Sequence, residues 1–155
     1  REEAIAAVAG LFNRAGRETS ISDDVDSLLW SKLIVNVGIN ALTALLRVPN
    51  GVLAQTPECD LLMARAVAEA VAVARALSIG LDGERQLERV REVCLRTADN
   101  RASMLQDILR GRPTEIDAIN GAVVARGRAA GVDTPVNLLL TQLVQALEAT
   151  VADRL

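Results

Sequence analysis

One stretch constrains the fold of this chain more than any other: WSKLIVNVGIN, residues 30–40. It reads as buried core except for Lys32, Asn36 and Asn40, which follow one another at intervals of four residues. Because four residues span slightly more than one helical turn, these side chains form one slanted polar stripe on an α-helix. Burying two amides and an ammonium is costly unless each finds a partner. The stripe therefore indicates either polar contacts between helices or a site for a ligand with carbonyl, hydroxyl and carboxylate groups.

The remaining sequence also follows helical patterns. Outside residues 18–21 no segment alternates apolar and polar residues as a strand does, and no repeat of fixed period occurs. We expect helices over residues 1–15, 24–46 and 59–78, in the segment GERQLERVREVCLRTADN, from Ser103 to LRGRP, over 115–130, and from Thr134-Pro135 to about residue 152. The sequence thus predicts one all-α domain, a compact bundle of about six to seven helices.

Short polar segments mark the expected helix ends. Ser22 or Asp23 can cap the helix over 24–46, and Thr114 can cap the helix over 115–130. The segment RVPNGVLAQTPE contains Pro-Asn-Gly, which is typical of turns, so we expect it to be a connector without a helix.

Composition narrows the classes of function. Half of the 155 residues are apolar and 24% are charged, a globular balance, and a net charge of −3 without a Lys/Arg run argues against a nucleic-acid surface. We find no apolar run of about 18 residues and no signal-peptide layout, so no membrane span is expected. Cys59 and Cys94 suit a reducing compartment, and we expect a cytoplasmic protein. The chain has no histidine and no cluster with metal-site spacing, so no metal is expected.

Lys32 is the only lysine among 17 basic residues; the other 16 are arginines. A chain that otherwise uses arginine has a lysine at this one position. Lysine differs from arginine in presenting a compact ammonium that can give up its proton. The residue type at position 32 therefore indicates a chemical role.

A second segment, NRASMLQDILRGRPTEIDAING, spans residues 100–121. Ser103 and Gln106 have the spacing of a capping box, which alone could explain the serine. Glu115, at the start of an expected helix, could be present only for its interaction with the helix dipole. On spacing alone, a structural and a functional role remain equally open for both residues.

These two segments resemble the C-terminal domain of ketopantoate reductases, the 2-dehydropantoate 2-reductase family. WSKLIVNVGINALTAL is similar to that family's Lys-x-x-x-Asn-x-x-x-Asn helix. NRASMLQDILRGRPTEIDAINGAVVARGRAAGVDTPVN resembles its second and more specific signature, and AVAEAVAVARALSIG follows its pattern of a glutamate in a helix of small residues. The resemblance runs over essentially all 155 residues and implies a helical bundle like the C-terminal domain of 6-phosphogluconate dehydrogenase-type reductases.

The resemblance implies roles for residues of both segments. In such a reductase Lys32 would polarise the substrate ketone and act as general acid, and Asn36 and Asn40 would hold substrate oxygens. Ser103 would bind the substrate carboxylate, and Asn100 would line the same cleft. The implied reaction is NADPH-dependent reduction of a 2-oxo acid, ketopantoate to pantoate, in pantothenate and coenzyme A biosynthesis.

Two glutamates receive different roles. The resemblance places Glu115 near the cofactor ribose and the lysine, as a catalytic and cofactor-binding residue. Glu69 lies in mid-helix among alanines, and we predict a structural role for it. Replacing Glu115 should therefore affect activity more than replacing Glu69.

One departure from the family pattern is large. These enzymes begin with a Rossmann domain that binds NADPH through a Gly-x-Gly-x-x-Gly loop, and neither that loop nor a βαβ pattern occurs here. Residues 1–155 are therefore expected to form the C-terminal domain alone, with the Rossmann domain as its partner and without activity in isolation. Two alternatives stay open: a paralogous reductase of another 2-oxo acid, and a non-catalytic helical domain for dimerisation or binding. The sequence leaves open whether the protein is a homodimer.

Overall fold

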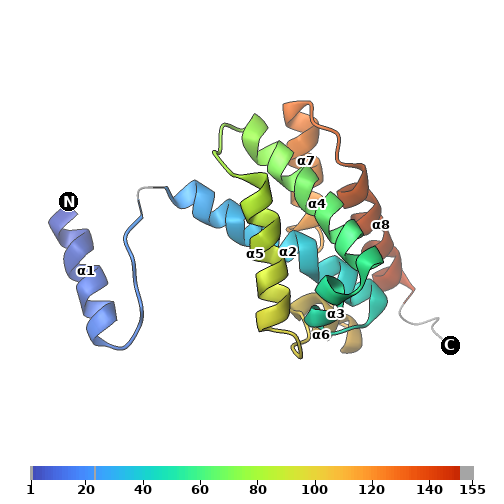
Figure 1. Ribbon diagram of the computed structural model, residues 1–155, viewed down its shortest axis with the longest axis horizontal. Helices are drawn as coiled ribbons and strands as arrows, with labels where there is room; N and C mark the ends of the chain where they lie inside the picture. The colour runs from blue at the N-terminus through green and yellow to red at the C-terminus, as the bar shows by residue number, and fades with distance from the viewer. Residues whose placement is uncertain (1, 23, 151–155) are drawn as a thin grey trace.

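The computed structural model describes residues 2–22 and 24–150, and this part of the chain is helical without any strand. Its helices are α1 (Glu2–Arg14), α2 (Val25–Leu46), α3 (Asn50–Gln55), α4 (Pro57–Ala76), α5 (Gly83–Arg96), α6 (Ser103–Leu109), α7 (Asn120–Ala130) and α8 (Pro135–Ala149). Helices α2 to α8 form one bundle (Figure 1). The predicted all-α class is confirmed, with one more helix than the sequence indicated.

Helix α2 occupies the centre of the bundle and packs against α3, α4, α5, α6 and α8. Half of its residues are buried, from Trp30 to Ala44. By length and composition alone the helix could cross a membrane, but 61% of its most apolar window is buried inside the bundle. Because neighbours surround most of this helix, its apolar residues form the core, and any polar residue on it is conspicuous.

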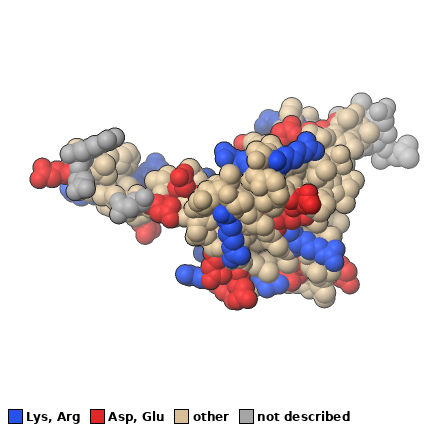
Figure 2. Space-filling model, turned by 90° about the horizontal axis from the view of Figure 1, so that it is seen from above, with Lys and Arg blue, Asp and Glu red and all other residues tan. Residues whose placement is uncertain are grey.

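Helix α1 stands away from the bundle and is joined to it by an extended segment, residues 17–22 (Figures 1 and 2). The Asn13 side chain turns the chain back at this point, because it donates to the carbonyl of Thr19 and accepts from the amide of Thr19. Four large apolar side chains of α1 are each about half exposed: Ile5, Val8, Leu11 and Phe12. We call residues 2–22 the arm. Its apolar face is not covered by the bundle.

Charges of both signs are interspersed over the face of the molecule that Figure 2 shows. Lysine and arginine side chains lie next to aspartates and glutamates there, and neither sign gathers into one continuous patch. The apolar face of the arm is therefore the more distinctive surface feature.

Two helix ends differ from the sequence expectations. The N-cap of α2 is Asp24, whose carboxylate accepts a hydrogen bond from the amide of Ser27. The Ser22 hydroxyl instead accepts from the amide of Asp24. Asp23, the other predicted cap, lies outside the described residues. Helix α7 begins at Asn120 rather than at residue 115, because residues 115–119 form tight turns.

The expected connector between α2 and α4 contains a helix, α3, that the sequence did not indicate. The sequence around Pro49 and Gly51 predicts a turn instead of a helix, because proline and glycine normally end a helix. The helix has long-range support: the amides of Asn50 and Gly51 donate to carbonyls of the loop that follows α5.

Gly38 lies where α2, α4 and α5 meet. A β-carbon at this position would lie 2.9 Å from Val90 Cγ1, 3.1 Å from Val67 Cγ2 and 3.3 Å from Met63 Cγ. These three side chains have at most 1% exposure, so they have little room to move. The close approach of the three helices therefore depends on glycine, which has no side chain, at position 38.

We predict that Gly38→Ala destabilises the fold. Overpacking typically costs about 1–3 kcal/mol, which outweighs the roughly 1 kcal/mol that alanine gains over glycine within a helix. Urea unfolding of the chain measures the difference. Gly80→Ala is the matched control, because a β-carbon there meets nothing within 4 Å and stability should be unchanged. A Gly38→Ala protein as stable as the wild type would contradict this account of the packing.

Candidate functional site

The polar stripe runs from the surface of α2 toward the interior. Lys32 is exposed, Asn36 is half-buried and Asn40 is buried, with 6% exposure. Among the described residues, none of the three side chains has a hydrogen-bond or ion-pair partner. None of the three side chains is therefore used in a contact within the described fold.

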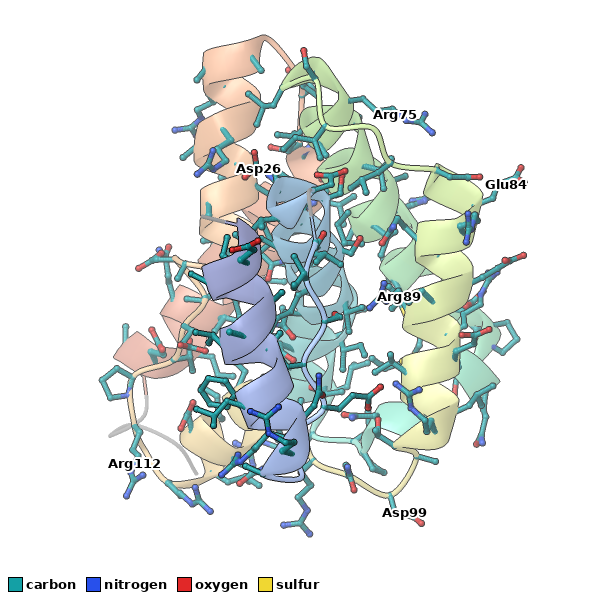
Figure 3. The ribbon with its side chains drawn as sticks, turned by 90° about the vertical axis from the view of Figure 1, so that its left-hand side faces the viewer. Asp26, Arg75, Glu84, Arg89, Asp99 and Arg112 are labelled. Carbon is teal, nitrogen blue, oxygen red and sulfur yellow. The ribbon has the colours of Figure 1, made fainter. Side chains whose placement is uncertain are left out.

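The Lys32 side chain lines a groove of about 980 Å³ between α2 and α5. The wall formed by α5 carries Arg85, Arg89 and Arg96 as well as acidic side chains. Figure 3 shows Arg89 lying between α5 and α2. The groove is open and mostly polar, so a charged, water-soluble molecule fits it better than an apolar one.

Ser103 and Asn100 lie at the end of α6 that faces the loop after α5. Ser103 is the first residue of α6 and is exposed, while Ala102 holds the N-cap position. The capping-box prediction is wrong, because the side-chain amide of Gln106 donates to the carbonyl of Arg101 and the Ser103 hydroxyl bonds to no described residue. Asn100 is exposed and lines a separate groove of about 500 Å³. Ser103 is therefore not explained as a cap.

Glu115 lies in the turn that precedes α7. Its neighbour Thr114 accepts a hydrogen bond from the amide of Ile116, which shapes the turn. Because α7 begins five residues later, Glu115 is outside the first turn of that helix and a dipole role does not explain it. Its side chain is exposed and bonds to no residue of the described chain.

The chain on its own does not enclose all six predicted residues in one cavity. The grooves at Lys32 and at Asn100 are separate. Helix α6, which begins with Ser103, packs directly against α2, the helix that carries the stripe. The predicted residues therefore lie on open, polar surface grooves, and another domain would be needed to enclose a ligand there.

Hydrogen bonding divides the seven asparagines of the chain into two groups. Four have side chains bonded within the described structure: Asn13, Asn50, Asn120 and Asn137. The other three are Asn36, Asn40 and Asn100, and their side chains have no such bond. These three are the ones that the sequence placed in the site. Sequence reasoning missed the structural role of Asn50, Asn120 and Asn137, which becomes visible only from their burial.

The structure gives Glu69 a structural role, as the sequence predicted. One carboxylate oxygen accepts from the amide of Val136 at 2.8 Å, and the other accepts from the amide and the side chain of Asn137 at 2.9 and 2.7 Å. Glu69 of α4 therefore caps α8. The connection continues to α7, because Asn120 Nδ2 donates to Asn137 Oδ1 at 3.0 Å.

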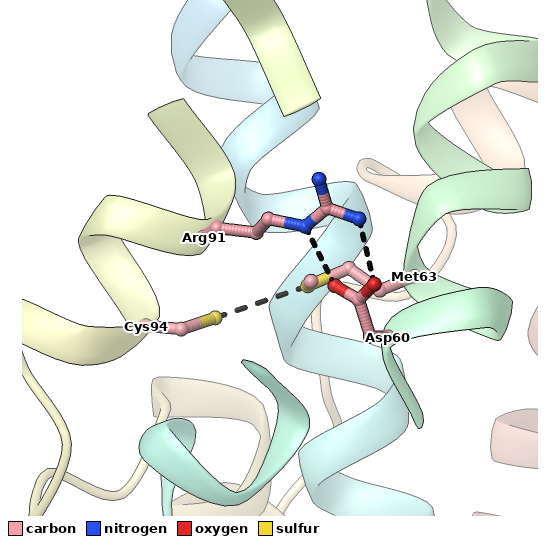
Figure 4. A network of polar contacts seen from close by, with 4 residues as sticks. All are labelled: Asp60, Met63, Arg91 and Cys94. Atoms are coloured by element: carbon pink, nitrogen blue, oxygen red, sulfur yellow. Dashed lines mark hydrogen bonds and ion pairs between the residues drawn. The ribbon is translucent and has the colours of Figure 1, made fainter. Parts of the chain in front are cut away.

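The two cysteines are unpaired, and Cys94 is unsuited to nucleophilic chemistry. Burial raises the pKa of the Cys94 thiol to about 11, so the thiol stays protonated at neutral pH. It lies 3.9 Å from Met63 Sδ, beside a bidentate pair in which Arg91 donates to Asp60 at 2.8 and 2.6 Å (Figure 4). Hydrogen bonds from Arg91 lower the pKa of Asp60. This cluster ties α4 to α5.

No group of three or more Asp, Glu or Cys side chains in the described part of the chain is arranged to hold a metal ion. The six predicted site residues offer one ammonium, neutral amides, a hydroxyl and a carboxylate, and the wall of the Lys32 groove adds the guanidinium groups of Arg85, Arg89 and Arg96. Such a set can hydrogen-bond a small oxygen-rich anion and can protonate it.

Residues 24–148 match the family model described as the ketopantoate reductase PanE/ApbA C-terminal domain. A 2-dehydropantoate 2-reductase of Halobacterium salinarum is 42% identical over 141 residues, which is 91% of this chain and 46% of that protein. The protein of the same name from Vibrio cholerae is 39% identical over 91% of this chain and 47% of its own length. The chain thus spans about half the length of the curated relatives it matches.

Two solved structures are similar to the whole chain. A PanE/ApbA family ketopantoate reductase from Ralstonia eutropha superposes with a TM-score of 0.88 and 35% identity, covering 95% of this chain and 49% of its own. A D-mandelate dehydrogenase, solved with NADH and anilino(oxo)acetate, gives a TM-score of 0.91 and 31% identity over 97% of this chain and 63% of its own. At these coverages the superposed residues include most of the arm.

We predict that Glu69→Ala lowers the free energy of unfolding by about 1–3 kcal/mol, because it leaves amides at the start of α8 without an acceptor. Thermal and urea unfolding measure the loss. Glu92→Ala is the control: that glutamate is exposed, and its replacement should change stability by at most about 0.5 kcal/mol. Equal stability of the two variants would show that Glu69 does not hold α8 in place.

Proposed function

The chain belongs to the family of ketopantoate reductase C-terminal domains, and we propose that it is the substrate-binding and catalytic-lysine domain of an NADPH-dependent 2-oxo acid reductase. The substrate we assign is 2-dehydropantoate, reduced to pantoate for pantothenate and coenzyme A biosynthesis. The observation that carries the proposal is the division of the asparagines. The three that the family signature places in the site have unbonded side chains, whereas every other asparagine side chain is bonded within the fold.

Reduction of a 2-oxo acid adds a hydride to the ketone carbon, and the C=O electron pair moves to oxygen, which then takes a proton. The nicotinamide cofactor supplies the hydride when bound. We assign the proton to Lys32: its ammonium donates a hydrogen bond to the ketone oxygen and transfers a proton as the alkoxide forms. Exposure in an open groove supports this role, because a substrate can reach the ammonium.

Four neutral side chains orient the substrate in this proposal. Asn36 and Asn40 donate to its hydroxyl and carbonyl oxygens, while Ser103 and Asn100 hold its carboxylate. Amides and hydroxyls can fix an anion without adding charge, so they orient the ketone without competing with the ammonium for the developing negative charge.

Glu115 is assigned to the cofactor side of the site. Its carboxylate is exposed and unbonded within the described chain, so it can accept hydrogen bonds from ribose hydroxyls.

The missing walls of the site are assigned to an N-terminal Rossmann domain of the same parent chain, which would bind most of the NADPH. Two observations support this partner. The chain spans about half the length of its relatives, and the arm presents apolar side chains that the bundle does not cover. Two unpaired cysteines are consistent with the cytoplasmic location that we propose.

A second candidate substrate is favoured by the likeness to D-mandelate dehydrogenase. That enzyme was solved with anilino(oxo)acetate, an oxamate whose amide carbonyl stands in for the ketone of an aryl 2-oxo acid. A paralogous reductase of another 2-oxo acid would use the same ammonium and amides, and only the groups around the substrate side chain would differ. Comparing turnover of 2-dehydropantoate and phenylglyoxylate by the two-domain parent separates the two candidates.

We predict that Lys32→Arg in the two-domain parent lowers turnover of 2-dehydropantoate nearly as far as Lys32→Ala does. Loss of a positioned general acid typically costs about 10²–10⁴ in rate, and a guanidinium is a poor proton donor. Thermal melts should change little, since Lys32 is exposed and unpaired in the described structure. An arginine variant that keeps most of the wild-type turnover would show that Lys32 is not the general acid.

A further inference from the structure

The loop between α5 and α6 carries Asn100 and leads directly into Ser103. Helix α3 holds this loop through its first two amides: Asn50 N donates to the carbonyl of Asn100, and Gly51 N donates to the carbonyl of Ala98, both at 3.0 Å. The amides at the start of a helix usually bond to a capping side chain or to water. Here the N-cap position is Pro49, which offers no side-chain acceptor, and the loop carbonyls serve instead.

A side-chain contact strengthens the same attachment. Asn50 Nδ2 donates to Thr97 Oγ1 at 2.9 Å, and Thr97 Oγ1 donates to the carbonyl of Val93 at 2.6 Å. Thr97 is the C-cap residue of α5, so its hydroxyl joins the end of α5 to the start of α3. We call Asn50, Gly51 and Thr97 the α3 clamp.

The clamp depends on close contact between backbones. A β-carbon on Gly51 would lie 2.7 Å from the β-carbon of Ala98 and 2.9 Å from its α-carbon. Because an α-carbon cannot rotate away as a side chain can, any larger residue at position 51 must displace the loop. The observed approach of the loop to α3 therefore requires glycine at position 51.

The clamp includes a buried polar atom without a hydrogen-bond partner among the described residues, and such an atom lowers stability. Asn50 is 7% exposed, and its Oδ1 is buried without a hydrogen-bond partner in the described chain. Replacing a hydrogen-bonded polar pair by apolar groups of similar shape is often nearly neutral for stability, so packing alone does not require this amide. An amide that joins α3 to Thr97 does, however, fix the loop at one defined position.

We propose that the α3 clamp positions the substrate-binding loop, so that Asn100 and Ser103 stand at a fixed place beside the polar stripe of α2. This inference rests on the proposed function, because it takes Asn100 and Ser103 as substrate ligands. Helix α3 contacts α2 as well as α4 and α5. The clamp thus attaches the substrate loop to the helices that line the Lys32 groove, α2 and α5, without touching the substrate.

Two variants of Thr97 in the two-domain parent test the proposal. Thr97→Val keeps the side-chain shape and removes the hydroxyl, whereas Thr97→Ser keeps the hydroxyl. We expect Thr97→Val to raise KM for 2-dehydropantoate by about three- to tenfold, the worth of one hydrogen bond, with KM for NADPH unchanged. Thr97→Ser should restore the wild-type KM. A fall in melting temperature without a change in the substrate KM would show a merely structural role and overturn the proposal.

Glycine variants supply a second test with a matched control. Gly51→Ala should displace the loop and raise KM for 2-dehydropantoate more than Thr97→Val does. Gly83→Ala should behave as wild type, because a β-carbon there makes only ordinary contacts at 3.5 Å and the residue lies outside the groove at Lys32. If Gly51→Ala does not fold, the Thr97 pair still decides the question. Equal substrate KM for Gly51→Ala and Gly83→Ala in folded proteins would overturn the proposal.

Amide hydrogen exchange separates failure of this inference from failure of the proposed function. In Thr97→Val the amides of Asn50 and Gly51 should exchange faster than in the wild type and in Thr97→Ser. Faster exchange with an unchanged substrate KM would mean that the clamp exists but does not position the substrate loop, which overturns this inference alone. A wild-type parent that reduces no 2-oxo acid would overturn the proposed function, and the positioning role with it.

Discussion

The burial of α2 is the constraint on which the rest of the structure depends. This helix packs against five others, and at Gly38 the approach is too close for even a methyl group. A helix so enclosed should be apolar, yet it carries an ammonium and two amides in one stripe. Lys32 at the outer end of the stripe is exposed and Asn40 at its inner end is buried, and neither side chain bonds to a described residue. In the proposed function the substrate supplies their partners.

The chain uses the same residue type for two purposes and keeps them apart. Asn137 and Asn120 connect α8 and α7 to the Glu69 carboxylate of α4, and Asn50 connects α3 to the end of α5. These bonded amides connect neighbouring helices of the bundle around α2. In the proposed function, the unbonded amides of the stripe and of the loop after α5 are then positioned by these packed helices, as a substrate site requires.

Sequence patterns predicted the elements that local signals specify. The extents of α2, α4 and α8 follow from apolar periodicity and from Pro135, and the stripe follows from four-residue spacing. Helix α3 could not be predicted, because Pro49 and Gly51 locally favour a turn and the stabilising bonds come from residues about 50 positions away. The structural roles of the other asparagines could not be predicted either, because only long-range contacts show that Asn120 is bonded within the described fold and Asn36 is not.

The central claim is that the chain leaves certain side chains unbonded for a substrate. The most direct measurement is NMR of the asparagine side-chain amides in the two-domain parent, on adding 2-dehydropantoate together with NADP⁺. The account predicts that the signals of Asn36, Asn40 and Asn100 shift on binding, whereas those of Asn120 and Asn137 stay near their free positions. Shifts confined to the second pair, or saturating ligand with no shift in the first three, would contradict it.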